Sequence, residues 1–121
     1  MNSSLRSKLL KIKRVCTKVA AKDTAYKPLE HLWSAEDPLA EHCGAVAYVV
    51  QNVLGGDVIS GVDNDGIRWL WNRIPSANGP IDVALTEDDL RPPVLSGKCL
   101  PPRKTVNPRF ALFYSRYLLA T

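Results

Sequence analysis

Cys43 is a candidate reactive thiol, and it is the first residue of an apolar stretch. From Cys43 to Leu54 the side chains are apolar on nearly every face of a helix, and Gln51 and Asn52 are the only strongly polar ones. A helix of this kind belongs in the middle of a domain. At its first turn, free backbone N–H groups and the helix dipole favour a thiolate. Cys43 is therefore a nucleophile, a partly activated thiol in a binding pocket, or an inert core residue.

A nucleophilic cysteine needs a neighbouring base, most often an imidazole. The chain holds two histidines, His31 and His42. His42 adjoins Cys43 in sequence, and neighbouring side chains at a helix start normally diverge. His31 precedes the loop 34–38 and could fold back toward Cys43. Both are candidate bases, and the sequence leaves open whether either imidazole reaches the thiol.

No metal or other cofactor is expected. His31 and His42 are not at a helical ligand spacing, and adjacent His42 and Cys43 are awkward ligands for one tetrahedral ion. Asp63 and Asp65 stand in a strong turn signal, but the tract lacks the glutamate of a calcium-binding loop. These two carboxylates therefore predict a hairpin turn.

Aromatic and amide side chains supply the candidate binding residues, which are Trp33, Trp69, Trp71 and Asn72. Trp33 lies just before the loop that leads to Cys43, so it would form one wall of a site there. Residues 68–73 alternate basic and aromatic types, as a strand that binds nucleic acid does. A strand with exposed arginine and buried tryptophan has the same pattern, so we do not expect nucleic acid as a partner.

Hydrophobic periodicity predicts the elements that position these residues. A helix over 3–22, capped by Ser3 or Ser4, carries one apolar stripe. A short helix over 29–33 and the central helix follow, and Gly55 and Gly56 end the latter. Strands are predicted over 57–62, 67–74 and 81–85, with a short helix capped by Thr86 after them. An irregular crossing over 91–108 precedes a last helix, which Asn107 caps.

Charge divides the chain into a basic helix, residues 1–22, and a single α+β domain, residues 23–121. The first part carries seven basic residues and no acid, and the second carries nine basic and twelve acidic residues. The basic helix could dock its apolar stripe on the domain, bind a protein or an anionic surface, or act as a targeting segment. Without a secretory signal or a transmembrane stretch, and with three cysteines, the chain is expected in the reducing cytoplasm.

An ordered series of short motifs resembles the YunG-like family of small bacterial proteins. The series runs over roughly residues 27–120 and comprises Trp33-Ser34-Ala35-Glu36, Cys43-Gly44-Ala45, Gly55-Gly56, Trp71-Asn72, Ile81-Asp82 and Leu85-Thr86. The resemblance implies an α+β fold, papain-like or NlpC-like in outline, with a central buried helix on a small antiparallel sheet and flanking terminal helices. It also implies that Cys43, a strand histidine and Asp82 would form a catalytic group.

This chain departs from the family pattern at the residue that would act as the catalytic base. Trp69 holds the position of the family's histidine, and His42 stands where the family has glutamine. Because an indole cannot accept a proton, the ordinary Cys–His pair is absent. We therefore expect a catalytically degenerate member that acts as a binding or interaction module. The alternatives are a cysteine hydrolase or transferase using Cys43, His31 or His42, and Asp82, and a membrane-surface protein recruited by its basic helix.

Overall fold

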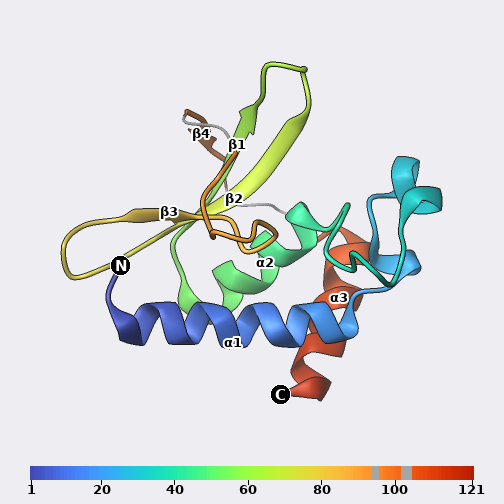
Figure 1. The fold of residues 1–121 in the computed structure, drawn as a ribbon, viewed down its shortest axis with the longest axis horizontal. Helices are drawn as coiled ribbons and strands as arrows, with labels where there is room; N and C mark the ends of the chain where they lie inside the picture. The colour runs from blue at the N-terminus through green and yellow to red at the C-terminus, as the bar shows by residue number, and fades with distance from the viewer. Residues whose placement is uncertain (94–95, 102–104) are drawn as a thin grey trace.

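The computed structural model describes residues 1–93, 96–101 and 105–121, and within them the chain has an α+β fold (Figure 1). Its helices are α1 (Ser3–Val19), α2 (Cys43–Leu54) and α3 (Pro108–Ala120), and its strands are β1 (Asp57–Val62), β2 (Arg68–Ile74), β3 (Ile81–Val83) and β4 (Lys98–Cys99). Two short 3-10 helices, η1 (Lys22–Thr24) and η2 (Lys27–Leu32), lead from α1 toward α2. The predicted fold class is confirmed.

Helix α2 begins and ends where its sequence predicts. Gly55 and Gly56 follow it with φ angles of +77° and +84°, in the region that residues with a Cβ rarely adopt. A Cβ on Gly56 would also collide with the carbonyl oxygen of Arg73. The two glycines therefore let the chain turn from α2 directly into β1, close against β2.

The four strands form one antiparallel sheet in the order β3-β2-β1-β4. The predicted hairpin joins β1 to β2 and pairs Ile59 with Trp71. In its turn, Asp63 accepts hydrogen bonds through Oδ1 from the backbone N–H groups of Asp65 and Ile67, at 2.8 and 3.0 Å. The tip of this hairpin projects away from the helices (Figure 1).

Alternate residues of β2 face opposite sides of the sheet, as strand geometry requires. On the helix side, Asn72 donates a 2.9 Å hydrogen bond from Nδ2 to the Ala47 carbonyl of α2, and Ile74 joins the main core. On the other side, Trp69 and Trp71 pack with Ile59 and Ala84 in a second, smaller cluster. The side chains of β2 thus tie α2 to one face and fill a separate core on the other.

The terminal helices complete the main core. From α1 the predicted stripe buries Leu9, Ile12 and Cys16, and from α3 the aromatic stripe buries Phe110, Phe113 and Tyr117. The predicted cap of α3 is confirmed, because Asn107 Oδ1 accepts from the Arg109 N–H at 2.9 Å. Of the three arrangements considered for the basic helix, the fold shows the first, with its apolar stripe docked.

Several predicted boundaries are wrong. Helix α1 ends at Val19 rather than at residue 22, and Asn2 caps it instead of Ser3 or Ser4. The helix predicted over 29–33 is the 3-10 helix η2, which ends at Leu32. The strand predicted over 67–74 begins at Arg68, and the strand predicted over 81–85 ends at Val83.

No helix begins at Thr86. Residues 84–90 form consecutive turns, with Leu90 at a φ of +61°. Pro92 and Pro93 leave too few residues there to offset the cost of helix nucleation. Strand β4 lies within the predicted irregular crossing, where its two residues carry no periodicity that could reveal it. Part of that crossing, 94–95 and 102–104, lies outside the described residues.

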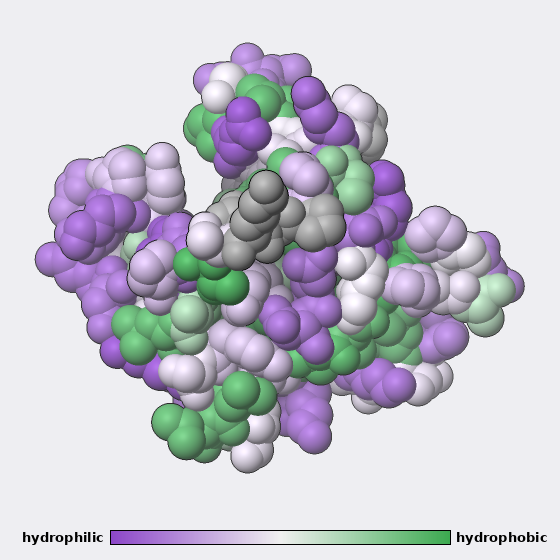
Figure 2. Space-filling model, turned by 180° about the vertical axis from the view of Figure 1, so that it is seen from behind, coloured by the Kyte–Doolittle hydropathy of each residue, from purple (hydrophilic) through white to green (hydrophobic). Residues whose placement is uncertain are grey.

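The surface seen from behind carries hydrophobic side chains at its lower end, over the end of α3 (Figure 2). Leu118 and Leu119 are exposed there, by 52% and 88%. Among the described residues, no helix combines the length and the apolar character that crossing a bilayer would take.

Candidate functional site

Cys43 occupies the first position of α2 and is half-buried. Burial raises the pKa of its thiol above the usual 9.0, and the backbone hydrogen bonds of Leu70 and Gly44 lower that pKa only in part. The nearby Glu41 carboxylate raises the pKa further. Although a helix N-terminus favours a thiolate, desolvation prevails here, so the thiol of Cys43 is protonated at neutral pH.

Leu70 is the residue of β2 that faces the start of α2. A Cβ on Gly44 would lie 3.2 Å from Leu70 Cδ1. Trp69, which the family resemblance set opposite Cys43, lies on the other face of the sheet and donates a 2.9 Å hydrogen bond from Nε1 to Asp63. The strand residue that faces the start of α2 is therefore aliphatic, and its side chain can neither accept nor donate a proton.

His42 is buried and engaged on both ring nitrogens. Nδ1 donates to the Ala40 carbonyl at 2.8 Å, and Nε2 lies 2.8 Å from Thr24 Oγ1. The ring packs against Phe113, with the ring centroids 5.5 Å apart. Burial lowers the pKa of His42 below 6.5, and the Arg109 charge adds to this. His42 thus connects η1 and α3 in the core.

The structure does not bring Asp82 to Cys43. Asp82 lies on β3 opposite Arg73, and its carboxylate accepts from Arg73 Nε at 2.7 Å and from Trp71 Nε1 at 3.1 Å. Burial acts to raise the pKa of Asp82, but these hydrogen bonds outweigh it and the pKa is lowered. The carboxylate therefore orients an arginine and an indole on the face away from α2. His31 lies on η2 with its side chain exposed.

The candidate binding residues hold the fold together. Trp33 donates from Nε1 to the Pro38 carbonyl at 3.0 Å and so closes the loop 34–38. Trp71 is 1% exposed and Asn72 2% exposed, and both have partners within the protein. These side chains, with Trp69, do not line the cavity that lies next to Cys43.

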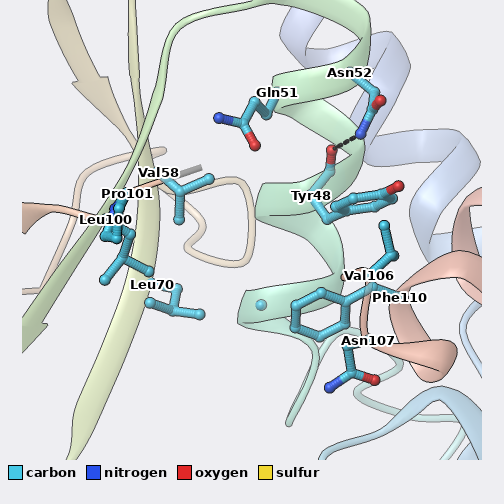
Figure 3. Close-up of a pocket in the computed structure, with 11 residues that line it drawn as sticks. Tyr48, Gln51, Asn52, Val58, Leu70, Leu100, Pro101, Val106, Asn107 and Phe110 are labelled. Carbon is cyan, nitrogen blue, oxygen red and sulfur yellow. Dashed lines mark hydrogen bonds between the residues drawn. The ribbon is translucent and has the colours of Figure 1, made fainter. Parts of the chain in front are cut away.

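That cavity lies between α2, the sheet and the start of α3, and measures about 260 Å³ (Figure 3). Helix α2 and the strands supply Gly44, Tyr48, Gln51, Asn52, Val58 and Leu70. The remaining wall consists of Leu100, Pro101, Val106, Asn107 and Phe110. Cys43 itself does not line the cavity, but Gly44, which follows it, and Leu70, whose backbone contacts the thiol, both do.

Sequence reasoning missed this cavity, although α2 carries two signals of it. Gln51 and Asn52 are polar residues in an otherwise apolar helix, and both lie at the cavity. Gly44 lets an aromatic ring approach the helix, since a Cβ there would be 2.5 Å from Phe110 Cζ. The opposite wall comes from residues distant in sequence, which no local pattern connects.

Comparison with known families gives one match. The model of a family described as YunG protein matches residues 8–106, which is most of the chain. The chain belongs to the YunG family. No curated protein and no solved structure matches this YunG-family chain. The match begins within α1 and ends before Asn107, whereas the resemblance seen in the sequence runs over roughly 27–120.

The family assignment fixes no chemistry for the site. The papain-like outline stays a prediction, because no solved structure matches the chain. Within the described parts of this YunG-family protein, no group of three or more His, Cys, Asp or Glu side chains could hold a metal ion. The protonated thiol and the neighbouring cavity are candidate features for a function.

Proposed function

We propose that this YunG-family protein is a binding module whose site is the cavity beside Cys43. One observation supports it above the others: an open cavity of about 260 Å³ adjoins a cysteine whose thiol is protonated and faces Leu70. Cavities that have mostly apolar walls and a few polar groups are the usual form of small-ligand sites. A cytoplasmic location belongs to the same proposal, since the free cysteines Cys16, Cys43 and Cys99 suit a reducing compartment.

The reactivity of Cys43 tests this proposal. Iodoacetamide alkylates the thiolate, so the rate follows the ionised fraction. We expect Cys43 to react at neutral pH more slowly than N-acetylcysteine, since a raised pKa leaves a smaller fraction of the thiol ionised. Mass spectrometry of each cysteine, with buried Cys16 as an internal control, gives the rate against pH. A rate above that of N-acetylcysteine, level through neutral pH, would contradict a binding role.

The alternative function is a cysteine hydrolase or transferase. It is favoured by the place of Cys43 at the start of α2, where the Leu70 and Gly44 backbone stabilises a thiolate in part. Since His42 is engaged on both nitrogens, the base would be His31. The same alkylation experiment separates this function from binding, because a working nucleophile needs an accessible thiolate at neutral pH.

Contact with an anionic surface or an acidic protein through α1 is a further candidate. The apolar stripe of α1 is buried, so membrane insertion through that stripe is no longer part of the proposal. The basic side chains Lys11, Arg14 and Lys18 remain exposed on the opposite face, where three- and four-residue steps place them in one row.

A further inference from the structure

The cavity beside Cys43 also carries information about the chemistry of its ligand. An apolar cavity of about 150 Å³ is large enough for benzene. The present cavity, about 260 Å³, therefore has room for a single substituted ring. Its size suits a small molecule or one side chain of a larger one.

Charge limits the ligand further. Of the described residues that line the cavity, none carries a charged side chain. An ionised group held among Leu70, Val58 and Phe110 would lose its hydration without gaining an oppositely charged partner from the lining residues that the structure describes, which is costly. The part of the ligand that enters the cavity is therefore neutral.

Aromatic side chains form one wall of the cavity. The rings of Tyr48 and Phe110 have centroids 6.0 Å apart and planes tilted by 36°, and Tyr114 meets the Tyr48 ring edge-on at 5.7 Å. Figure 3 shows Tyr48 and Phe110 across the cavity from Val58 and Leu70. A ring placed between an aromatic wall and an aliphatic wall gains both stacking and apolar contact.

Polar atoms lie at the edges of this apolar space. Gln51 donates from Nε2 to the Gly56 carbonyl at 3.2 Å, and its amide oxygen lies on the cavity side (Figure 3). Asn107 uses its own amide oxygen to cap α3. The Gln51 oxygen can therefore accept a hydrogen bond from a ligand, and a hydroxyl group is the simplest neutral donor.

We propose that the cavity binds a free, neutral, single-ring aromatic compound that bears a hydroxyl group. The proposal rests on the binding role assigned to the cavity above and names its ligand class. The ring lies between Tyr48 on one side and Val58 on the other, and the hydroxyl donates to Gln51 Oε1.

NMR titration of the full chain with para-cresol tests the assignment. We expect saturable shifts of the amide signals of Gly44, Tyr48 and Leu70. Para-hydroxybenzoate and tyramine, which add one charge of either sign, should bind at least about tenfold more weakly because the charge is unpaired. Cyclohexanol should also bind more weakly. Equal binding of the charged analogues or of cyclohexanol would overturn the ligand class.

Two variants locate the contacts. Gln51→Leu should weaken the binding of para-cresol and leave unchanged the binding of toluene, which lacks the hydroxyl. An equal effect on the binding of both compounds would overturn the role of Gln51. Leu70→Trp should fill the cavity and abolish binding, whereas Leu119→Trp, at a residue 88% exposed, should not. Because Gln51 is exposed, its variant keeps the proposal testable even if Leu70→Trp does not fold.

Two further results separate the sources of failure. Binding of N-acetyltyrosinamide as tight as that of para-cresol would place the ring on a partner's chain and overturn the assignment to a free compound. If no compound of the panel binds while Cys43 alkylates slowly, the ligand class is wrong and the binding role stands. If Cys43 alkylates as a thiolate, the binding role itself is wrong.

Discussion

At the scale of single residues, the buried imidazole of His42 joins three parts of the chain. It donates to Ala40, meets the hydroxyl of Thr24 and packs on Phe113. Thr24 Oγ1 also lies 3.0 Å from the Ala21 carbonyl. When the imidazole is neutral, the hydroxyl can donate to Nε2; when it is protonated, the hydroxyl must turn to Ala21. The neutral form is favoured, because burial lowers the pKa of His42. The Arg109 charge lowers this pKa further and outweighs the Asp23 charge, which raises it.

This lowered pKa predicts a loss of stability in mild acid. The unfolded chain takes up a proton as the pH falls below about 6.5, and the folded chain does so only at lower pH, so the free energy of unfolding falls in between. Urea unfolding at about pH 7.5 and about pH 5.5 measures the difference. His42→Gln should cost about 1–3 kcal/mol at the higher pH and should reduce the pH difference.

His31→Gln, at an exposed site, is the matched control and should keep the wild-type pH difference. The carboxylates of Asp23, Asp63 and Asp82 have pKa values lowered from 3.8 and titrate below this range, whereas burial raises the pKa of Glu87 above 4.5, which acts in the opposite direction and equally in wild type and both variants. An unchanged pH difference in His42→Gln would show that the imidazole is not responsible.

At the scale of elements, the junction of α2 and β1 sets the distance between the helix and the sheet. The chain leaves α2 through Gly55 and Gly56 and enters β1 at Asp57. Gly56 lies so close to the Arg73 carbonyl of β2 that no side chain fits between them. This junction positions Tyr48 and Gln51 of α2 opposite Val58 and Leu70 of the sheet, and so determines the width of the cavity.

Gly56→Ala should therefore be strongly destabilising. It combines an unfavourable positive φ, which costs roughly 1–2 kcal/mol, with a collision against backbone, for a total of about 3 kcal/mol or more. Gly66→Ala is the matched control, because Gly66 has a φ of +78° but nothing within 4 Å of an added Cβ. Urea unfolding of both variants gives the two losses. Equal losses would mean that the approach to Arg73 is not restrictive.

At the scale of the whole molecule, α1 presents a row of exposed basic side chains to solvent. Helix α1 runs along the edge of the molecule, with α2 between it and the sheet (Figure 1). Its outer face exposes Lys11, Arg14 and Lys18, while its inner face is in the core. Like charges three and four residues apart weaken an isolated helix by a few tenths of a kcal/mol per pair, roughly. Packing of α1 against α3 must offset this repulsion.

Charge reversal on α1 tests the contact with an anionic surface. Wild-type protein should bind vesicles that contain phosphatidylserine, and salt should weaken this binding, since each basic residue near such a surface contributes about 1 kcal/mol. The triple variant Lys11→Glu, Arg14→Glu, Lys18→Glu should lose it. The control Lys27→Glu, Arg91→Glu, Lys98→Glu makes the same change in net charge at other exposed sites. Equal losses in the two variants, measured by vesicle sedimentation, would refute a specific contact through α1.

The sequence predicts where helices and strands lie better than it predicts which side of a strand faces a helix. Apolar content and the glycine pair gave both ends of α2, and Asn107 with Pro108 gave the start of α3. The side of β2 that meets α2 could not be read from the sequence. Both Trp69 and Leu70 are apolar, and a shift of one residue in register exchanges the two faces. The cavity could not be predicted either, because it forms where segments that are distant in the sequence meet.

The packing of α1 on α3 has a consequence for synthesis of the protein. The stripe of Leu9, Ile12 and Cys16 leaves the ribosome before α3, with Phe113 and Tyr117, has been made. Until then α1 is a basic amphipathic helix without its partner, since contacts between distant segments form only once both exist. The nascent chain therefore exposes an apolar surface that the finished protein hides, and a chaperone or a membrane can engage that surface only during this interval.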